Sequence, residues 1–226
     1  GHYLGEKDIF GKPRVMQYEP IGHTPLLIYH PEAAPNVISS LSTNVDLHAT
    51  LTDLFDLNVD HVTHGRSLLP DILGLKTPAR DWAVGGIFGN WVQIQDGRYK
   101  YARGPTTDNY PLSMWSNRWS TMPVPYYPGL RLPNPDARAY IDFMPGSSVP
   151  VLRQPFEPGD MLPFWSMDAS LDDHYLFDLQ EDPHEEHNLI GSKLEHQMIA
   201  LLEDALRDLN APAEQAARLG LPSASY

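Results

Sequence analysis

The sequence contains no cysteine, so disulfides, thiolate metal sites and a cysteine nucleophile are excluded within its 226 residues. It also lacks an Asn-x-Ser/Thr glycosylation site and any apolar run near the roughly 18 residues that a membrane-spanning helix needs. The chain begins at Gly1, without a methionine or a signal peptide. These absences leave the compartment undecided between the cytoplasm and the periplasm.

Basic residues are scarce: 16 Lys and Arg stand against 29 Asp and Glu, which gives a formal net charge of −13. A surface that binds nucleic acid needs clustered cations to neutralise phosphates, and a polybasic membrane anchor needs them too. We therefore expect neither nucleic acid nor a membrane as a partner. The hydrophobic content of 42% is that of a globular chain, and the length fits one large domain or two small ones.

Proline, in contrast, is abundant: the chain has 22, of which twelve lie between Gly104 and Trp165. This stretch also carries seven tryptophans and tyrosines, whereas a disordered linker would be poor in aromatic residues. We predict that residues 104–165 form an ordered but irregular excursion, stiffened by proline and packed by its own rings. Ordered loops of this length are often lids or subunit contacts, and filling a local core is the alternative use of the rings.

The first third of the chain predicts one buried strand and two helices. The apolar run Leu26–Tyr29 does not alternate and is closed by His30-Pro31, which is typical of a strand buried on both faces of a parallel sheet. No parallel partner is evident elsewhere in the sequence. Thr43 and Asp46 form a capping box, and a short helix is expected over residues 68–73. The capping box precedes an apolar stripe at helical spacing, Leu47, Leu51, Leu54 and Phe55.

The remainder of the chain predicts antiparallel strands and a terminal helix. Residues 91–95 and 98–101 alternate around Asp96-Gly97, as in a hairpin with a type I′ turn. Further strands are expected near residues 82–88 and 174–179. A second capping box, formed by Ser192 and Glu195, precedes an amphipathic last helix.

This order of elements predicts an α/β fold in two parts. Residues 1–75 are expected to be the C-terminal end of a main α/β domain, with its last strand and helices. Residues 76–226 are expected to form a small α+β subdomain, in which a helix packs on an antiparallel sheet and residues 104–165 form the excursion.

Ten histidines raise the question of a metal site. His61 and His64, and likewise His184 and His187, stand three residues apart beside carboxylates. A zinc-protease helix instead carries two histidines four residues apart, with a glutamate as base. Because both pairs also adjoin turn signals, surface loops are the favoured interpretation.

Five segments occur in an order that matches a known enzyme family. They are residues 1–28, which include Gly11-Lys12 and Tyr18-Glu19, and then residues 45–54, 65–70, 96–100 and 175–189. In this order they resemble the sulfatases of the alkaline phosphatase superfamily, whereas residues 104–165 match no segment of that family. The resemblance implies an alkaline phosphatase-like α/β fold, of which this chain is the C-terminal portion.

The resemblance also implies an activity. Family members cleave sulfate esters with a formylglycine nucleophile and a divalent cation, usually calcium, and both lie in the N-terminal part. This chain alone is therefore expected to be inactive and to bind no cation. Its expected partners are the N-terminal portion of the same protein and a small sulfate or phosphonate ester, with oligomerisation left open. The alternatives are a phosphonate monoester or phosphodiester hydrolase of the same superfamily, and a non-catalytic assembly module.

The resemblance assigns roles to three residues. Lys12 takes the position of the lysine that touches the sulfate oxygens, although on its own it would read as a solvated surface lysine. His23 stands where the family more often has arginine, and it is expected to support the loop through Glu19 or to face the substrate. His2 follows the family's metal-binding tripeptide, so it is expected close to the metal without ligating it.

Overall fold

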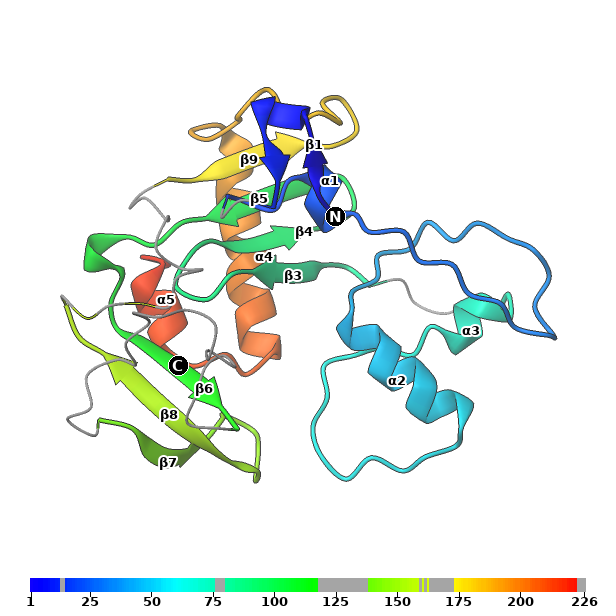
Figure 1. The fold of residues 1–226 in the computed structure, drawn as a ribbon. Coiled ribbons are helices and arrows are strands. Elements are labelled where there is room, and N and C mark those ends of the chain that lie inside the picture. The colour runs from blue at the N-terminus through cyan, green and yellow to red at the C-terminus, as the bar shows by residue number, and fades with distance from the viewer. Residues whose placement is uncertain are drawn as a thin grey trace.

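A four-stranded antiparallel sheet forms the centre of the protein (Figure 1). In this computed structural model the described residues are 1–12, 15–75, 80–117, 138–158, 160, 162 and 173–222. The strands are β3 (Ala83–Gly86), β4 (Val92–Gln95), β5 (Tyr99–Arg103) and β9 (Tyr175–Asp178), in the order β3-β4-β5-β9. The helices α4 (Lys193–Asp208) and α5 (Glu214–Arg218) follow the last strand. The antiparallel sheet and the terminal helix predicted from the sequence are thus confirmed.

The two faces of this sheet are covered by different parts of the chain. Successive side chains of a strand point to opposite faces, and those on one face pack against α4 and α5 in the main core. Its buried members include Ile94, Tyr101, Leu176, Met198, Leu202 and Leu219. On the other face, Ala102 and Phe177 pack with Met16 and Trp91, while Tyr18 lies against this cluster. The N-terminal segment therefore covers the face that α4 leaves open.

A second sheet lies within the predicted excursion. It has the strand order β6-β8-β7, with β6 (Leu112–Ser116), β7 (Tyr140–Phe143) and β8 (Pro150–Phe156) all antiparallel. The expectation of an irregular excursion was therefore wrong for these residues, because Leu112, Met114 and Phe156 share one buried face as in an ordinary sheet. Four of its predicted packing rings, Trp119, Tyr126, Tyr127 and Trp165, lie outside the described residues.

Ion pairs fix this second sheet to α5. Arg153 on β8 pairs with Glu214 at 2.8 Å, and its guanidinium lies 4.7 Å from the ring centroid of Trp115. Ser113 Oγ donates to Glu214 Oε2 at 2.9 Å. Because Glu214 and Arg218 are both buried, α5 is held firmly between the two sheets.

The hairpin of β4 and β5 is confirmed, but its turn differs from the predicted one. Gln95 pairs with Lys100, so the loop residues are Gly97 and Arg98 rather than Asp96 and Gly97. Among these, only Gly97 has a positive φ, of 97°. A type I′ turn needs positive φ at both central residues. Here the Asp96 carboxylate instead accepts the N–H groups of Arg98 and Tyr99.

The N-terminal residues form a small hairpin and a one-turn helix. Strands β1 (Tyr3–Leu4) and β2 (Phe10–Gly11) pair across the 3₁₀ turn η1 (Glu6–Asp8), and α1 (Glu19–Gly22) follows. Another 3₁₀ turn, η2 (Thr107–Asn109), precedes β6. Within the described residues, no helix is long and apolar enough to cross a membrane.

Residues 23–75 lie beside the sheet and carry α2 (Val45–Leu54) and α3 (Leu69–Ile72) (Figure 1). Both helices were predicted, but the buried strand at Leu26–Tyr29 is not formed. These residues have no strand partner within the described part of the chain, and Leu27 is 92% exposed. A strand buried on both faces requires neighbours for its backbone groups. The predicted boundary between residues 75 and 76 stays a prediction.

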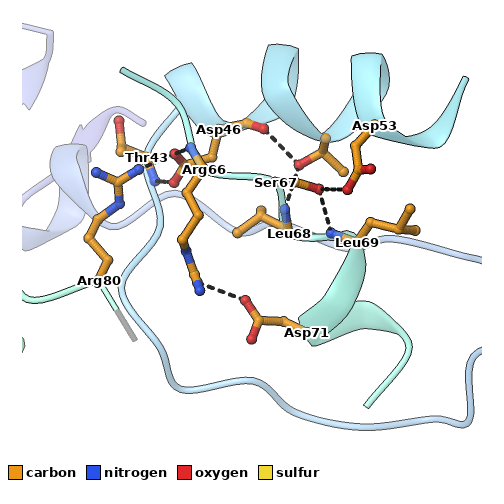
Figure 2. Close-up of polar contacts among 10 residues, drawn as sticks. Thr43, Asp46, Asp53, Arg66, Ser67, Leu68, Leu69, Asp71 and Arg80 are labelled. Atoms are coloured by element: carbon orange, nitrogen blue, oxygen red, sulfur yellow. Dashed lines mark hydrogen bonds and ion pairs between the residues drawn. The ribbon is translucent and has the colours of Figure 1, made fainter. Parts of the chain in front are cut away.

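Buried Asp46 holds α2, α3 and the preceding loop together (Figure 2). Its carboxylate accepts the N–H of Thr43 at 2.9 Å and that of Arg66 at 2.7 Å, and it pairs with the guanidinium of Arg80. The contact with Thr43 is the carboxylate half of the predicted capping box. Thr50 extends the network, because its hydroxyl accepts the N–H of Leu68.

We expect Asp46→Asn to lower the opening free energy of this region by about 3–5 kcal/mol, because the largely buried Arg80 loses its counter-ion. Hydrogen exchange of the α2 amides measures this. Asp53→Asn on the exposed side of the same helix is the control, with an expected change below about 1 kcal/mol. Equal effects of the two substitutions would contradict the role given to Asp46.

Candidate functional site

A buried lysine joins three segments that are far apart in the sequence. Lys100 on β5 is 4% exposed and lies on the sheet face away from α4. Its ammonium donates to Glu185 Oε1 at 2.9 Å and pairs with Glu19 Oε1 at 2.5 Å. It also donates to the carbonyl of Gln17 at 3.2 Å. We call Lys100, Glu185 and Glu19 the buried anchor.

Glu185 holds the N-terminal region at two further points. Its Oε2 accepts the backbone N–H of Glu19 at 2.7 Å, which fixes the start of α1. Its carbonyl accepts from Lys7 Nζ at 2.5 Å, which fixes the tip of the N-terminal hairpin. Lys7 also lies 5.0 Å from the ring centroid of Tyr18. Glu185 therefore contacts the chain both before and after Lys12.

Lys12 follows directly after β2 and is exposed. Within the described part of the chain, its ammonium forms no hydrogen bond or ion pair. Its backbone is nevertheless restrained, because the preceding residue, Gly11, pairs with Tyr3. A lysine of this kind, exposed but carried on a fixed backbone, is available to an anionic ligand.

His23 ends α1 and contacts Glu19, as the sequence predicted. Its Nδ1 lies 3.2 Å from Glu19 Oε2, and its side chain is 80% exposed. This contact is an ion pair when the imidazole is protonated. Glu19 thus connects an exposed imidazole to the buried ammonium of Lys100.

The first two residues pack against α1. A Cβ at Gly1 would lie 2.2 Å from the carbonyl oxygen of Pro20, so only glycine fits this approach. His2 is therefore carried beside α1, where it is exposed. The three predicted site residues His2, Lys12 and His23 all belong to the N-terminal unit, which consists of the hairpin and α1 (residues 1–12 and 15–23). Their contact with a substrate or a metal stays a prediction.

Two tyrosines beneath this unit are perturbed by burial. Burial raises the pKa of Tyr3 to about 12, and the nearby charge of Glu185 adds to the rise. Tyr3 is 0% exposed, and its hydroxyl donates to the carbonyl of Met16 at 3.4 Å. Burial also raises the pKa of Tyr18, again with help from the charge of Glu185. Both phenols are therefore held neutral, and they pack the N-terminal segment onto the sheet.

A group of possible cation ligands lies next to Glu185 but serves the loop itself. The ligand atoms of Asp182, Glu186 and His187 lie within 4.8 Å of one another. Burial alone would raise the pKa of Asp182, but the N–H groups of His187 and Glu186 donate to its carboxylate and lower it overall. The Asp182 carboxylate therefore closes the turn of its own loop, while Glu186 and His187 are exposed.

The buried anchor was not predicted from the sequence. Lys7, Lys100 and Glu185 were not among the predicted site residues. One signal was available for Lys100, which lies between Tyr99 and Tyr101 in a strand expected to be covered. Glu185 lies in residues 175–189, a segment that resembles the family, but its acidic and histidine neighbours indicated an exposed loop.

Comparison with known proteins bears on the family. A choline-sulfatase of Rhizobium meliloti (strain 1021) is 29% identical to this chain over 107 residues, which make up 45% of this chain and 20% of that protein. The chain is thus similar to part of a choline-sulfatase. It spans about a fifth of the length of that curated protein. No protein-family model matches it.

The solved structures that this chain resembles are distant from it. A 2-O GAG sulfatase is 17% identical, with a TM-score of 0.38, and the match covers 74% of this chain and 25% of that one. A protein of glycosaminoglycan metabolism from Bacteroides thetaiotaomicron is 17% identical, with a TM-score of 0.37, and the match covers 74% and 24%. Likenesses of this size carry no further conclusion.

The raised pKa of Tyr3 predicts an alkaline transition in the stability of this chain. Since the pKa is about 10 in the unfolded chain and about 12 in the folded one, Tyr3 favours folding below pH 10 and loses that contribution as the pH rises through 12. Between pH 9 and pH 12 the parent chain should lose up to about 2–3 kcal/mol of stability through the ionisation of Tyr3. Tyr3→Phe should not show this loss. Urea unfolding at a series of pH values measures this.

Tyr29→Phe is the control for this experiment, because Tyr29 is 90% exposed. Its pH profile should follow that of the parent chain. If Tyr3→Phe and Tyr29→Phe gave the same profile, the burial of the Tyr3 phenol would not matter to stability.

Proposed function

We propose that this chain is the C-terminal part of a sulfatase-like hydrolase that cleaves sulfate esters. The similarity to choline-sulfatase supports it, together with one structural observation: the exposed Lys12 directly follows the hairpin that Glu185 holds through Lys7. The formylglycine nucleophile and the divalent cation, calcium by resemblance, are supplied by the N-terminal portion. The chain alone is inactive.

In this proposal Lys12 binds the sulfate group and stabilises its transition state. Cleavage of a sulfate ester places negative charge on the leaving oxygen and on the non-bridging oxygens of the sulfate. A fixed cation beside these oxygens lowers the barrier without reorganising during the reaction. His23, oriented by Glu19, stands at the end of α1 as a second polar contact for the substrate. A phosphonate ester presents similar oxygens to the same groups.

The N-terminal portion has a surface to cover. Leu27, Tyr29 and Val37 are each at least 90% exposed, and the apolar stripe of α2 is exposed as well, with Phe55 at 66%. An apolar surface of this kind marks an interface in a soluble protein. The choline-sulfatase relative is about five times as long as the matched stretch, so its remaining length is ample to supply the covering domain.

We expect Lys12→Ala, in the enzyme that joins this chain to its nucleophile-bearing portion, to lower kcat by about 10²–10³-fold, the usual loss of one electrostatic contact to a transition state. Stability should hardly change, because the Lys12 ammonium has no partner within the described residues. Steady-state kinetics on an aryl sulfate and an aryl phosphonate measure this, and they also show which ester is preferred.

Lys193→Ala at the exposed start of α4 is the matched control and should keep full activity. Unchanged kinetics of Lys12→Ala on both esters would refute the role of Lys12.

The apolar surface gives a separate test. Without its N-terminal portion, the chain should self-associate in light scattering, and adding that portion should replace self-association by a one-to-one complex. Leu27→Asp should weaken both associations, whereas Ile141→Asp, at an exposed position of strand β7, should weaken neither. A monodisperse monomer with no partner present would count against this interface.

A further inference from the structure

The position of Lys12 depends on contacts made by another part of the chain. Lys12 lies between two tethered points: Lys7 on the hairpin before it and the start of α1 after it. Lys7 Nζ donates to the carbonyl of Glu185, and Glu185 Oε2 accepts from the N–H of Glu19. One residue of the 182–187 loop thus holds both flanks.

We propose that Glu185, held by Lys100, is the positioning residue that places Lys12 for the transition state. This inference rests on the proposed function, because it assumes that Lys12 contacts the reacting ester. Glu185 itself is 3% exposed, so it does not reach a substrate; it acts through the hairpin that ends just before Lys12 and through the start of α1.

The loop around Glu185 has a backbone conformation that lets this one residue hold both Lys7 and the start of α1. Glu185 has a φ of 55°, which is uncommon for a residue other than glycine. Asp182 imposes this turn, because its carbonyl accepts the N–H of Glu185 at 3.0 Å while its carboxylate accepts the next two N–H groups. The turn directs the carbonyl of Glu185 to Lys7 and its carboxylate to Lys100 and Glu19. A loop with the usual negative φ at Glu185 would not direct both the carbonyl and the carboxylate to these partners.

The charges in the buried anchor favour position over stability. One ammonium, that of Lys100, faces the two carboxylates of Glu185 and Glu19, and all are largely removed from water. Buried ion pairs often stabilise a fold no more than apolar side chains would, but they define one geometry. The ion pairs fix the register of Gln17 and Glu19 against β5.

The anchor also reaches the surface through Glu19. Lys100 holds Glu19 Oε1, and His23 Nδ1 lies 3.2 Å from Glu19 Oε2. A change at Glu185 should therefore alter the imidazole of His23 as well, which gives a spectroscopic signal that does not depend on activity.

The first experiment measures activity in the joined enzyme with Glu185→Gln and, separately, Lys7→Met. Glu185→Gln cannot accept at both Lys100 and the N–H of Glu19, and Lys7→Met releases only the hairpin. A displaced catalytic group costs up to about 100-fold in rate. We therefore expect kcat to fall by about 10–100-fold for Glu185→Gln and by less for Lys7→Met, with KM within about threefold, because the loss is confined to the transition state.

Two controls separate positioning from general destabilisation. Leu202→Ala removes a fully buried contact on the opposite face of the sheet, so it weakens the fold without touching the N-terminal segment. Lys193→Met matches Lys7→Met on an exposed helix start. Both should keep kcat within about twofold at temperatures where the protein is folded. If Leu202→Ala lowered kcat as much as Glu185→Gln, the effect would be one of stability, and the inference would fail.

The second experiment needs no activity and uses this chain as it stands. Amide exchange at Glu19, Ile21 and His23 should be at least about tenfold faster in Glu185→Gln, while the amides of α4 stay unchanged. The ¹⁵N shifts of the His23 ring should move toward those of an unrestrained imidazole. Should Glu185→Gln fail to fold, Lys7→Met gives the same readouts at the hairpin.

The outcomes distinguish this inference from the proposed function. If Lys12→Ala lowers turnover but Glu185→Gln does not, the positioning role is overturned and the function stands. If Lys12→Ala has no effect, the proposed function fails, and unchanged exchange and ring shifts in Glu185→Gln would then overturn the anchor as well.

Discussion

The contact of Lys100 with Glu185 and Glu19 is the constraint on which the rest of the N-terminal unit depends. A lysine is rarely buried, because removing its charge from water is costly unless carboxylates and hydrogen bonds compensate. Here they come from two segments, residues 17–19 and the 182–187 loop, which the ion pairs join on the sheet face that Met16 and Tyr18 also cover. The ion pairs thus connect separate segments on this face, as the apolar core does on the opposite face.

The central sheet separates two kinds of packing. Toward α4 it buries aliphatic and aromatic side chains, which provide most of the driving force for folding. Away from α4 it buries a charged anchor surrounded by Tyr3, Tyr18 and Phe177, which contribute less stability and more geometric definition. Residues 23–75 lie outside both layers and expose apolar side chains, which the N-terminal portion covers in the proposed enzyme.

Patterns that depend on neighbouring residues could be predicted from the sequence. The β4–β5 hairpin, α4 and α2 follow from alternation and helical spacing, and the contact of His23 with Glu19 follows from their spacing of four residues. The buried anchor could not be predicted, because Glu19 and Glu185 are 81 and 85 positions from Lys100 in the sequence. Glu185 also lies in a loop with an unusual backbone. The strand expected at Leu26–Tyr29 failed for the opposite reason: its local pattern was clear, but a strand needs a neighbour that these residues do not have within the described part of the chain. The second sheet, formed by β6, β7 and β8, was not predicted because prolines interrupt the alternation of apolar and polar residues in this part of the sequence.

The proposed division of labour places the anion-binding lysine in this chain and the nucleophile in an N-terminal portion. Its most direct test is sulfate release from an aryl sulfate by three proteins: this chain alone, the nucleophile-bearing portion alone, and the two joined. The account predicts release by the joined protein only. Release by this chain alone, or undiminished release by the nucleophile-bearing portion without it, would contradict the account.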